Sequence, residues 1–477
     1  MILLLPDISL LLLAALVMGY DLYKGKTDLV STAPFHLAWA GLTGIFLLLL
    51  CLPHNGPAPA PYLGGYQVTG TSLLFKQVFV LSALFTVLLS RPYFTPGGSH
   101  RGVLKYRSEF LFILLLCTFG MFTVVSATDL LTLFIGMELA TIPLYVLSGF
   151  HKKDNLSVEA STKYIVMGSA STGLLLFGYS FFYGAAGSLT FEALAQACSA
   201  NPQEPLLRIG VLFMLAAIGF KLTIFPFHMW APDVYDGAPS PVTAFISVSS
   251  KAVAIAFLLI LVYGPLVAMH DQLQPIILIL AAATMTVGNL GALKQERLRR
   301  FMAYSSIAQA GYIIMALVGD AGAARSSIIF YLFVYAAANY AVFFILSIIG
   351  RNGEEHRSGL QGLGKNNPLL AGILMLTAFS LAGIPPLAGF MGKFFLFASA
   401  AEQGYYFMVI FAALNSTISL YYYLLLVKEA YIIQPAGETK PLVLDGIQKI
   451  SLFLLTAIML LAGIWPSVSS SILAVAG

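Results

Sequence analysis

Apolar runs long enough to cross a lipid bilayer follow one another along this chain, separated by short polar stretches. A helix that spans a bilayer needs about 20 predominantly apolar residues. Only 10% of the 477 residues are charged, whereas a soluble domain carries about 25%, so the chain cannot cover a surface that faces water. These features predict an all-α polytopic membrane protein and leave no segment for a soluble domain.

We predict about 14 transmembrane helices in the 477 residues, because a span with its loop takes about 30 to 35 residues. The first run has no basic segment before it and no cleavage-type end before Tyr20 and Asp21. We therefore expect a retained helix rather than a signal peptide. The expected spans are residues 2–19, 35–52, 72–90, 108–125, 127–149, 160–184, 206–229, 240–266, 274–292, 301–319, 325–350, 368–399, 405–430 and 449–466.

Lysine and arginine residues gather in the odd-numbered loops between these spans. Even-numbered loops and their helix ends hold only Lys76, Arg208 and Arg325, and neither terminus carries a basic residue. Because cytoplasmic loops carry the excess of Lys and Arg, we expect both termini on the outer (periplasmic) side of a bacterial inner membrane. The basic residues of the odd loops are Lys24, Lys26, Arg91, Arg101, Lys105, Arg107, Lys152, Lys153, Lys163, Lys294, Arg297, Arg299, Arg300, Arg351, Arg357, Lys365, Lys428, Lys440 and Lys449.

The net charge of +4 reflects this topology and does not indicate a nucleic-acid partner. Cys51, Cys117 and Cys198 are far apart and form no C-x-x-C pair, so disulfide frameworks, iron–sulfur clusters and covalent haem lack ligands. No phosphate-binding glycine loop, nucleotide fingerprint or His/Cys/carboxylate metal set appears in the loops. We therefore expect no cofactor and no metal in this chain.

Four ionisable residues fall inside the apolar spans: Glu138, Lys221, Lys251 and Lys393. A charge at the bilayer centre costs about 2.5 to 3.5 kcal/mol on insertion scales, so such residues usually face the bundle interior, pair, and mark ion pathways. Buried ion pairs that only fix helix packing are the alternative. Three positive charges cannot all be neutralised by one negative charge, which favours proton or ion transfer.

Lysine suits a proton relay because burial disfavours its charged form while a nearby carboxylate favours it. We hypothesise that Glu138, when close, keeps Lys221 protonated, and that withdrawal of Glu138 lets Lys221 pass its proton to a neighbour such as Lys251. His228, which ends the seventh span in FPFHMW, also titrates near neutrality. A histidine bonded to a backbone carbonyl is the simpler interpretation of that residue.

Two of the buried lysines lie beside prolines. Pro226 follows Lys221 by five residues in GFKLTIFPFHMW, and Pro385 and Pro386 precede Lys393 in LAGIPPLAGFMGKFF. A proline inside a span removes a backbone hydrogen bond and opens the helix, and such breaks form ion sites in many transporters. An ordinary proline kink is the alternative for either break alone.

Lysine and proline occur in opposite order in the two breaks, as an inverted repeat would place them. Helices 4–8 and 9–13 are two sets of five, and an odd number of spans in each set forces opposite orientation. We therefore predict an N-terminal three-helix segment (residues 1–107), two inverted five-helix repeats (108–266 and 267–430), each with a broken helix, and a last helix (431–477).

Smaller polar features have two interpretations. The cluster LKQERLRRFMAYSS is most simply a cytoplasmic anchor, and the Pro and Gly residues of WAPDVYDGAPSP predict tight turns. Polar side chains within the spans could line a water path, but small polar residues also hold membrane helices together. These residues are Ser247, Ser249, Ser250, Asn289, Asn339 and Asn415.

Four segments together resemble a known family. LTLFIGMELATIPLYVL, GFKLTIFPFHMWAPDVYDGAPSPVTAFISVSSKA, RRFMAYSSIAQAGY and SLAGIPPLAGFMGKFFLF are similar to the antiporter-like membrane subunits of proton-translocating NADH:quinone oxidoreductase, respiratory complex I. The resemblance runs from helix 4 to helix 13. It is greatest to the subunit N branch, which has a lysine rather than a glutamate in broken helix 12 and no long lateral helix after the last span.

The resemblance implies a proton half-channel in each repeat, joined by a polar axis at mid-membrane. It implies that Glu138 corresponds to the helix 5 glutamate, Lys221 to the helix 7 lysine, Lys251 to the connecting lysine of helix 8 and Lys393 to the helix 12 lysine. The chain would be a non-redox subunit of the translocase. Its partners would be other membrane-arm subunits, including antiporter-like neighbours and small hydrophobic subunits, while NADH, flavin, iron–sulfur clusters and quinone are used by other subunits.

Two alternatives stay open at this point. A subunit of a multi-subunit cation/proton antiporter or of a membrane-bound hydrogenase would share the broken-helix motifs. A structural membrane scaffold is the alternative of another class, and it predicts that all four buried charges could be replaced by apolar residues with activity retained.

Overall fold

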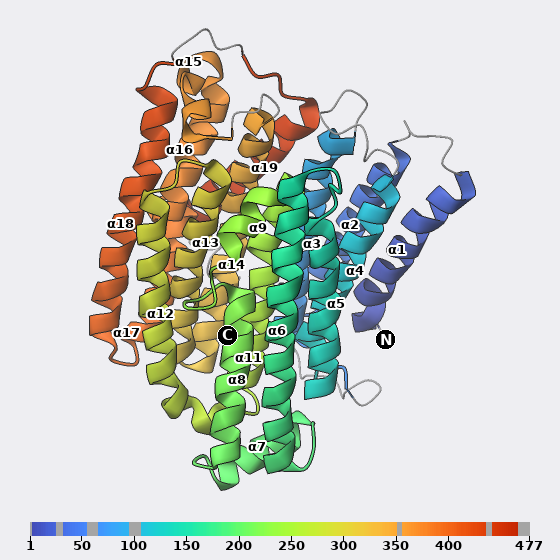
Figure 1. Ribbon diagram of the computed structural model, residues 1–477, viewed down its shortest axis with the longest axis vertical. Coiled ribbons are helices and arrows are strands. Elements are labelled where there is room, and N and C mark those ends of the chain that lie inside the picture. Colours follow the sequence, from blue (N-terminus) through green and yellow to red (C-terminus); the bar gives the residue numbers. More distant parts are fainter. Residues whose placement is uncertain are drawn as a thin grey trace. The chain divides into compact units, whose positions relative to one another are not determined.

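The computed structural model describes residues 2–24, 32–54, 65–94, 106–350, 355–435 and 441–465, which fold almost entirely into α-helices (Figure 1). Five basic residues of the odd loops lie outside the described residues, as does the last residue of the final predicted span, Pro466. The five are Lys26, Arg101, Lys105, Arg351 and Lys440.

The helices run in order along the chain with short connections. The earlier ones are α1 (Leu5–Lys24), α2 (Ala33–Cys51), α3 (Gly70–Ser90), α4 (Arg107–Ser126), α5 (Leu130–Ser148), α6 (Asn155–Ala186), α7 (Phe191–Ala200), α8 (Pro205–Leu222), α9 (Ala231–Gly237), α10 (Ser240–Phe245) and α11 (Lys251–Val262). The later ones are α12 (His270–Leu293), α13 (Leu298–Met315), α14 (Ala321–Ile349), α15 (Leu363–Asn366), α16 (Pro368–Ala382), α17 (Ala388–Ala401), α18 (Tyr406–Tyr431) and α19 (Gly446–Ile464).

Each predicted span coincides with a helix or with a series of helices. Among the described residues, 13 helical segments are long and apolar enough to cross a membrane. The span predicted at residues 368–399 is divided into α16 and α17, as expected for a broken helix. The prediction of an all-α polytopic membrane protein is confirmed. The helix α7 was not predicted, because its 10 residues are too few for a span.

The chain divides into two compact units. Unit 1 comprises Met1–Trp230 and Gly237–Ile276, and unit 2 comprises Ala231–Asp236 and Ile277–Gly477. Most of α9 therefore belongs to unit 2, although the chain before and after it belongs to unit 1.

Within unit 1, α4 and α5 pack closely because glycines face the neighbouring backbone. A Cβ atom on Gly120 would lie 2.4 Å from the backbone nitrogen of Ala140, and one on Gly136 would lie 2.8 Å from that of Val124. Only glycine permits such an approach. The contact fixes the turn of α5 that carries Glu138.

In unit 2, α14 is buried along nearly its whole length. It packs against α16, α17 and α19. Phe330 and Val334 of α14 form an apolar cluster with Ala388 of α17 and Ala462 of α19. This cluster anchors the start of α17, the helix that carries Lys393.

Both predicted helix breaks are present. α8 ends at Leu222, and the next residue, Thr223, has φ +60°, a left-handed conformation that is unusual for a β-branched residue. α16 ends at Ala382, and Gly383 with φ +87° turns the chain before α17 begins at Ala388. The prolines of both motifs lie within these turns.

The helix around Lys251 is irregular as well. One turn of π-helix, Ile246–Ser250, separates α10 from α11, and Lys251 is the first residue of α11. Such turns are rare and are frequent at functional sites. The irregular backbone therefore marks the same region as the buried lysine.

The segment WAPDVYDGAPSP contains α9 in addition to the turns that its composition predicts. The basic cluster before α13 contacts this helix, because Arg300 lies 2.7 Å from Asp233 and Arg297 lies 3.0 Å from Asp236. Burial raises the pKa of the Asp236 carboxyl, and the neighbouring arginines oppose that rise. The ion pairs hold α9 beside the start of α13 within unit 2.

Candidate functional site

Glu138 and Lys221, the expected pair, meet in unit 1. α5 carries Glu138 and the last turn of α8 carries Lys221, whose Nζ lies 3.4 Å from Glu138 Oε1. The Lys221 side chain is 2% exposed and that of Glu138 is 15% exposed. Lys221 Nζ also donates to Thr141 Oγ1 at 3.3 Å. Strong charge-assisted bonds measure about 2.7 to 2.9 Å, so this ion pair is buried but loose.

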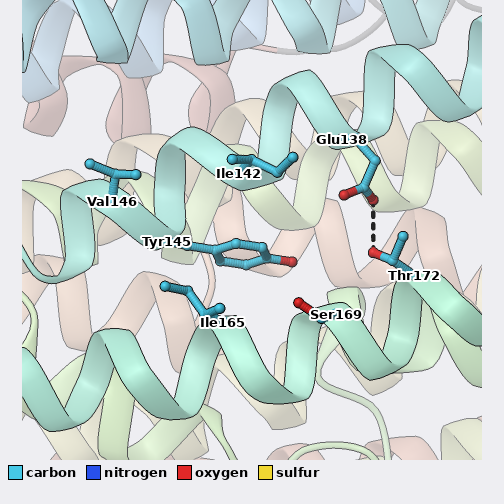
Figure 2. A pocket seen from close by; sticks show the side chains of 7 residues that line it. All are labelled: Glu138, Ile142, Tyr145, Val146, Ile165, Ser169 and Thr172. Atoms are coloured by element: carbon cyan, nitrogen blue, oxygen red, sulfur yellow. Dashed lines mark hydrogen bonds between the residues drawn. The ribbon is translucent and has the colours of Figure 1, made fainter.

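A second donor bonds to the same carboxylate oxygen. Thr172 of α6 donates to Glu138 Oε1 at 2.9 Å, which is shorter than the lysine contact. Glu138 and Thr172 border a cavity of about 290 Å³ between α5 and α6, which Figure 2 shows. The cavity is large enough for water, so Glu138 has both a second partner and space to move. Its other lining residues are Ile142, Tyr145, Val146, Ile165 and Ser169.

Lys251 is buried at the start of α11, with 2% of its surface exposed. Its Nζ donates to Thr223 Oγ1 at 2.8 Å. Thr223 is the left-handed residue that ends α8, two positions after Lys221. The break that follows α8 thus brings the Thr223 hydroxyl into direct contact with Lys251, and Thr223 is only two residues from Lys221 in the sequence.

Lys393 lies in α17 of unit 2 and is 3% exposed. Its Nζ donates at 3.0 Å to the carbonyl oxygen of Ala382, the last residue of α16, and at 3.0 Å to Ser416 Oγ of α18. Ser416 donates to the same carbonyl at 3.1 Å. The break between α16 and α17 therefore supplies a backbone acceptor for the buried ammonium group, as the proline motif predicts.

His228 is buried in the turn after α8, and its ring lies 5.8 Å from that of Phe225. Within the described part of the chain, no hydrogen bond joins His228 to Glu138, Lys221 or Lys251. The structure therefore places this histidine near the helix break but does not bring it into contact with the Glu138–Lys221 pair or with Lys251.

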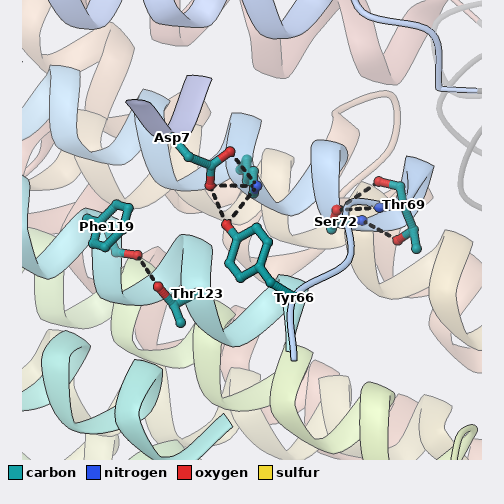
Figure 3. A network of polar contacts seen from close by, with 7 residues as sticks. Asp7, Tyr66, Thr69, Ser72, Phe119 and Thr123 are labelled. Atoms are coloured by element: carbon teal, nitrogen blue, oxygen red, sulfur yellow. Dashed lines mark hydrogen bonds and ion pairs between the residues drawn. The ribbon is translucent and has the colours of Figure 1, made fainter. Parts of the chain in front are cut away.

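A second buried carboxylate–lysine pair, Asp7 and Lys76, lies in α1 and α3, so the expectation that the buried charges of the spans are Glu138, Lys221, Lys251 and Lys393 alone is wrong. Lys76, which the sequence places at a helix end, is the seventh residue of α3 and is fully buried. Its Nζ lies 2.8 and 2.9 Å from the two carboxylate oxygens of Asp7 in α1. Tyr66 also donates to Asp7 (Figure 3), and burial raises the pKa of the Tyr66 phenol, which keeps it neutral.

The hydroxyl side chains that bond to Glu138, Lys221, Lys251 and Lys393 were not predicted: Thr141, Thr172, Thr223 and Ser416. One signal was available, since Thr141 follows Glu138 by three residues and so shares its face of α5. The other three come from different helices or from a helix break. No spacing in the sequence connects them with the residues that they contact.

The chain matches a known protein family and known proteins. Residues 127–419 match the family described as "NADH:quinone oxidoreductase/Mrp antiporter, TM". NADH-quinone oxidoreductase subunit N of Moorella thermoacetica is 37% identical over 434 residues, which cover 91% of this chain and 89% of the relative. The subunit N of Parvibaculum lavamentivorans is 34% identical over 473 residues, which cover 96% of this chain and 95% of the relative.

Solved structures share the fold. A chain of respiratory complex I from Thermus thermophilus is 30% identical with a TM-score of 0.83, and the match covers 99% of this chain and all of that one. A chain of the Mrp complex from Dietzia has a TM-score of 0.82 at 21% identity, covering 100% of this chain and 96% of that one, a likeness of fold alone. The resemblance that the sequence motifs indicate is confirmed, and the chain belongs to the subunit N family of NADH-quinone oxidoreductases.

Proposed function

We propose that this chain moves protons across the membrane as the non-redox subunit N of NADH:quinone oxidoreductase, and that Glu138 controls the first step. Other subunits would take electrons from NADH through flavin and iron–sulfur clusters to quinone. The energy of that reaction would move Glu138 relative to Lys221. The observation that carries the proposal is the buried and loosely held ion pair between these two residues, at 3.4 Å.

Glu138 has two alternative partners in this proposal. When it approaches Lys221, its negative charge favours the protonated lysine. When it turns toward Thr172 and the adjacent cavity, Lys221 loses that support and releases its proton. The lysine keeps its hydrogen bond to Thr141 in both positions, so the proton can leave without leaving the side chain unpaired.

Thr223 supplies the next step of the proposed relay. Its hydroxyl accepts from Lys251 and lies two residues beyond Lys221. A hydroxyl group can accept a proton on one side while it releases its own on the other, and it stays neutral throughout. We propose that the proton passes by way of Thr223 to Lys251 and continues to Lys393 in unit 2. His228 borders the same helix break and is a candidate for supplying or receiving the proton there.

The partners that we propose are other membrane-arm subunits, including antiporter-like neighbours and small hydrophobic subunits. One side of α5 leaves large apolar side chains about half exposed: Leu131, Ile135, Ile142 and Val146. The cavity that Glu138 borders includes two of these residues. A neighbouring subunit on this face could reach Glu138 and move it, whereas lipid chains could only cover the apolar side chains.

The proposed membrane arrangement follows the basic residues. Both termini lie on the outer side of the bacterial inner membrane in this proposal, and the odd loops lie in the cytoplasm. Residues 108–266 and 267–430 form the two inverted repeats, each with one broken helix. Support comes from the two breaks, since one lies after Lys221 and the other lies before Lys393.

The test is Lys221→Ala in the assembled complex, measured in inverted membrane vesicles as NADH oxidation by quinone and as proton uptake. We expect both rates to fall at least about tenfold, because removal of a proton-transfer group commonly costs that much or more. The matched control is Lys163→Ala, which removes a lysine of an exposed Glu–Lys pair on α6. If Lys221→Ala leaves both rates at the control level in fully assembled complexes, the proposal is wrong.

The same vesicles separate the alternatives. A subunit of a cation/proton antiporter would exchange sodium for protons in the absence of NADH and quinone. A structural scaffold would tolerate apolar replacements of Glu138, Lys221, Lys251 and Lys393 together, with activity retained. Loss of NADH-driven proton uptake in the single variant Lys221→Ala excludes the scaffold.

A further inference from the structure

The cavity beside Glu138 contains a buried hydroxyl group without a hydrogen-bond partner. Tyr145 is 5% exposed, and its phenol oxygen makes no hydrogen bond within the described part of the chain. Thr141, one turn earlier on α5, lies beside the phenol, but its own hydroxyl donates to the carbonyl oxygen of Met137 at 2.9 Å. A buried hydroxyl that lacks a partner destabilises the folded state, and such groups are few in native proteins. Phenylalanine would fill nearly the same volume without that cost, so packing alone does not account for a tyrosine at this position.

The neighbours of Tyr145 hold its ring in one orientation. Tyr164 of α6 meets the ring edge-on, with ring centroids 4.7 Å apart, and Tyr164 in turn stacks on Trp230 at 4.4 Å. A Cβ atom on Gly168 would overlap the phenol oxygen, so only glycine leaves room for the hydroxyl at this place on α6. The position of the unpaired hydroxyl is therefore fixed by both helices that form the cavity.

The phenol points toward the polar end of the cavity. Figure 2 shows the Tyr145 oxygen on the side of the cavity where Glu138, Ser169 and Thr172 lie. Tyr145 follows Glu138 by seven residues, so the two share one face of α5 and lie two turns, or about 10 Å, apart along the helix. Side chains on a helix lean toward its N-terminus, which brings the phenol back toward Glu138. Glu138 is also the charged side chain that acts electrostatically on this phenol.

The polar end of the cavity has the donors that a carboxylate needs. Thr172 already donates to Glu138 Oε1 at 2.9 Å, and Tyr145 and Ser169 bring two further hydroxyl groups to the same end. An ionised carboxylate accepts at about four lone-pair sites, and hydrogen bonds to it are about twice as strong as those between neutral groups. A carboxylate that turned into the cavity would exchange the ammonium group of Lys221 for hydroxyl donors, which favour its ionised form.

Water is the alternative partner of the phenol. The cavity of about 290 Å³ has room for water, and a water molecule there could bond to Tyr145. A tyrosine that only binds water would have no effect on where Glu138 lies. The two alternatives therefore differ in whether loss of the phenol hydroxyl acts through the charge of Glu138.

We propose that Tyr145 is a positioning residue that holds Glu138 when it turns away from Lys221, a role that rests on the proposed function of the chain. In the position that the structure shows, Glu138 bonds to Lys221 and Thr172. In the second position its carboxylate accepts from the Tyr145 phenol and keeps Thr172 as a partner. The phenol keeps its own proton throughout, so only its hydrogen bond changes. Lys221 is then left without its negative partner.

The experiment removes the phenol hydroxyl with Tyr145→Phe in the assembled complex and measures NADH-driven proton uptake and quinone reduction in inverted vesicles. Both rates should fall about tenfold, because the second position of Glu138 loses a hydrogen bond to a charged group. The amount of assembled complex should stay normal, since phenylalanine keeps the ring contact with Tyr164. Tyr183→Phe is the matched control, because Tyr183 lies on α6 and is 54% exposed, and it should match the unmodified complex.

A double variant separates this role from packing. Glu138→Gln lacks the charge that the phenol is proposed to bind, so Tyr145→Phe should lower the rates by no more than about twofold further in that background. Equal losses in both backgrounds, or lower assembly of Tyr145→Phe with a normal rate per complex, would make Tyr145 structural and overturn the proposal. If Glu138→Gln is impaired while Tyr145→Phe behaves as Tyr183→Phe does, only the second position at the phenol is wrong. If Glu138→Gln also pumps normally, the proposed function itself is wrong.

Discussion

Two buried carboxylate–lysine pairs in unit 1 are chemically alike and differ in geometry. Asp7 binds Lys76 with both oxygens, at 2.8 and 2.9 Å, whereas Glu138 reaches Lys221 with one oxygen at 3.4 Å. The exposed fractions of the side chains are 0% and 8% in the first pair, and 2% and 15% in the second. The tighter pair is the one that the sequence did not predict.

The surroundings explain the difference. Lys76 Nζ lies 5.4 and 5.1 Å from the ring centroids of Tyr66 and Phe122, and Tyr66 donates to Asp7. The charged groups of Asp7 and Lys76 bond to each other and lie beside aromatic rings. Glu138 instead borders a cavity and accepts from a second donor. A fully satisfied polar network makes the structure rigid, so the first pair fixes α1 against α3 while the second is free to change.

The largest expected effect is the loss of stability when the tight pair, Asp7 and Lys76, is broken. Lys76→Met leaves the Asp7 carboxylate buried without its cation, and breaking a buried pair in this way costs about 3 to 5 kcal/mol. We expect a large loss of assembled complex and a lower melting temperature in detergent. The rate of proton uptake per assembled complex should stay normal, because no step of the relay uses Lys76.

The double variant Asp7→Leu with Lys76→Met is the control for this prediction. Replacement of both partners by apolar residues removes the unpaired charge, so assembly should recover. Normal assembly of Lys76→Met with reduced proton uptake would instead make the tight pair part of the relay.

For the loose pair, Glu138 and Lys221, we expect a large loss of proton uptake and a small loss of stability. Glu138→Gln keeps an acceptor for Thr172 but removes the charge, so proton uptake should fall at least about tenfold. Stability should change by less than about 1 kcal/mol, because Lys221 keeps Thr141 as a partner and can adopt its neutral form. Proton uptake and melting temperature are measured on the same preparation. A large loss of stability with normal uptake would make this pair structural as well.

The spans and the main buried charges could be predicted from the sequence, because a lysine in the middle of a long apolar run is rare and costly. Lys221, Lys251 and Lys393 are recognisable for this reason, and so are the breaks, since proline cannot continue the hydrogen bonds of a helix. The tight pair escaped prediction because Asp7 and Lys76 lie within the first two turns of their helices. Charged residues at that depth are ordinarily at the membrane surface.

The partners of the buried groups could not be predicted. Thr223 contacts Lys251 only because the chain turns through a left-handed conformation that glycine usually adopts. Tyr312 lies over Lys393 because α13 packs against α17. Such contacts depend on packing between helices that are distant in the sequence, and no periodicity within one helix encodes them.

A smaller effect is expected when the hydrogen bond from Thr172 to Glu138 is removed. Thr172→Val keeps the shape of the side chain and deletes its hydrogen bond, which contributes about 1 kcal/mol, or about a fivefold change in equilibrium. Glu138 should then stay nearer Lys221, and coupled proton uptake should slow by up to about fivefold. Thr162→Val, at an exposed threonine of the same helix whose hydroxyl donates to the carbonyl oxygen of Val158, is the control. Equal rates in the two variants would mean that Thr172 does not compete for Glu138.

The smallest effect is expected at a third carboxylate–lysine pair, which lies on the surface of α6. Glu159 and Lys163 are 2.6 Å apart, closer than either buried pair, but their side chains are 57% and 41% exposed. Water and salt screen such a pair, so Lys163→Met should change the free energy of unfolding by no more than about 0.5 kcal/mol. Melting temperatures at low and high salt measure this contribution. A change as large as that of Lys76→Met would mean that distance, rather than burial, determines what an ion pair contributes in this protein.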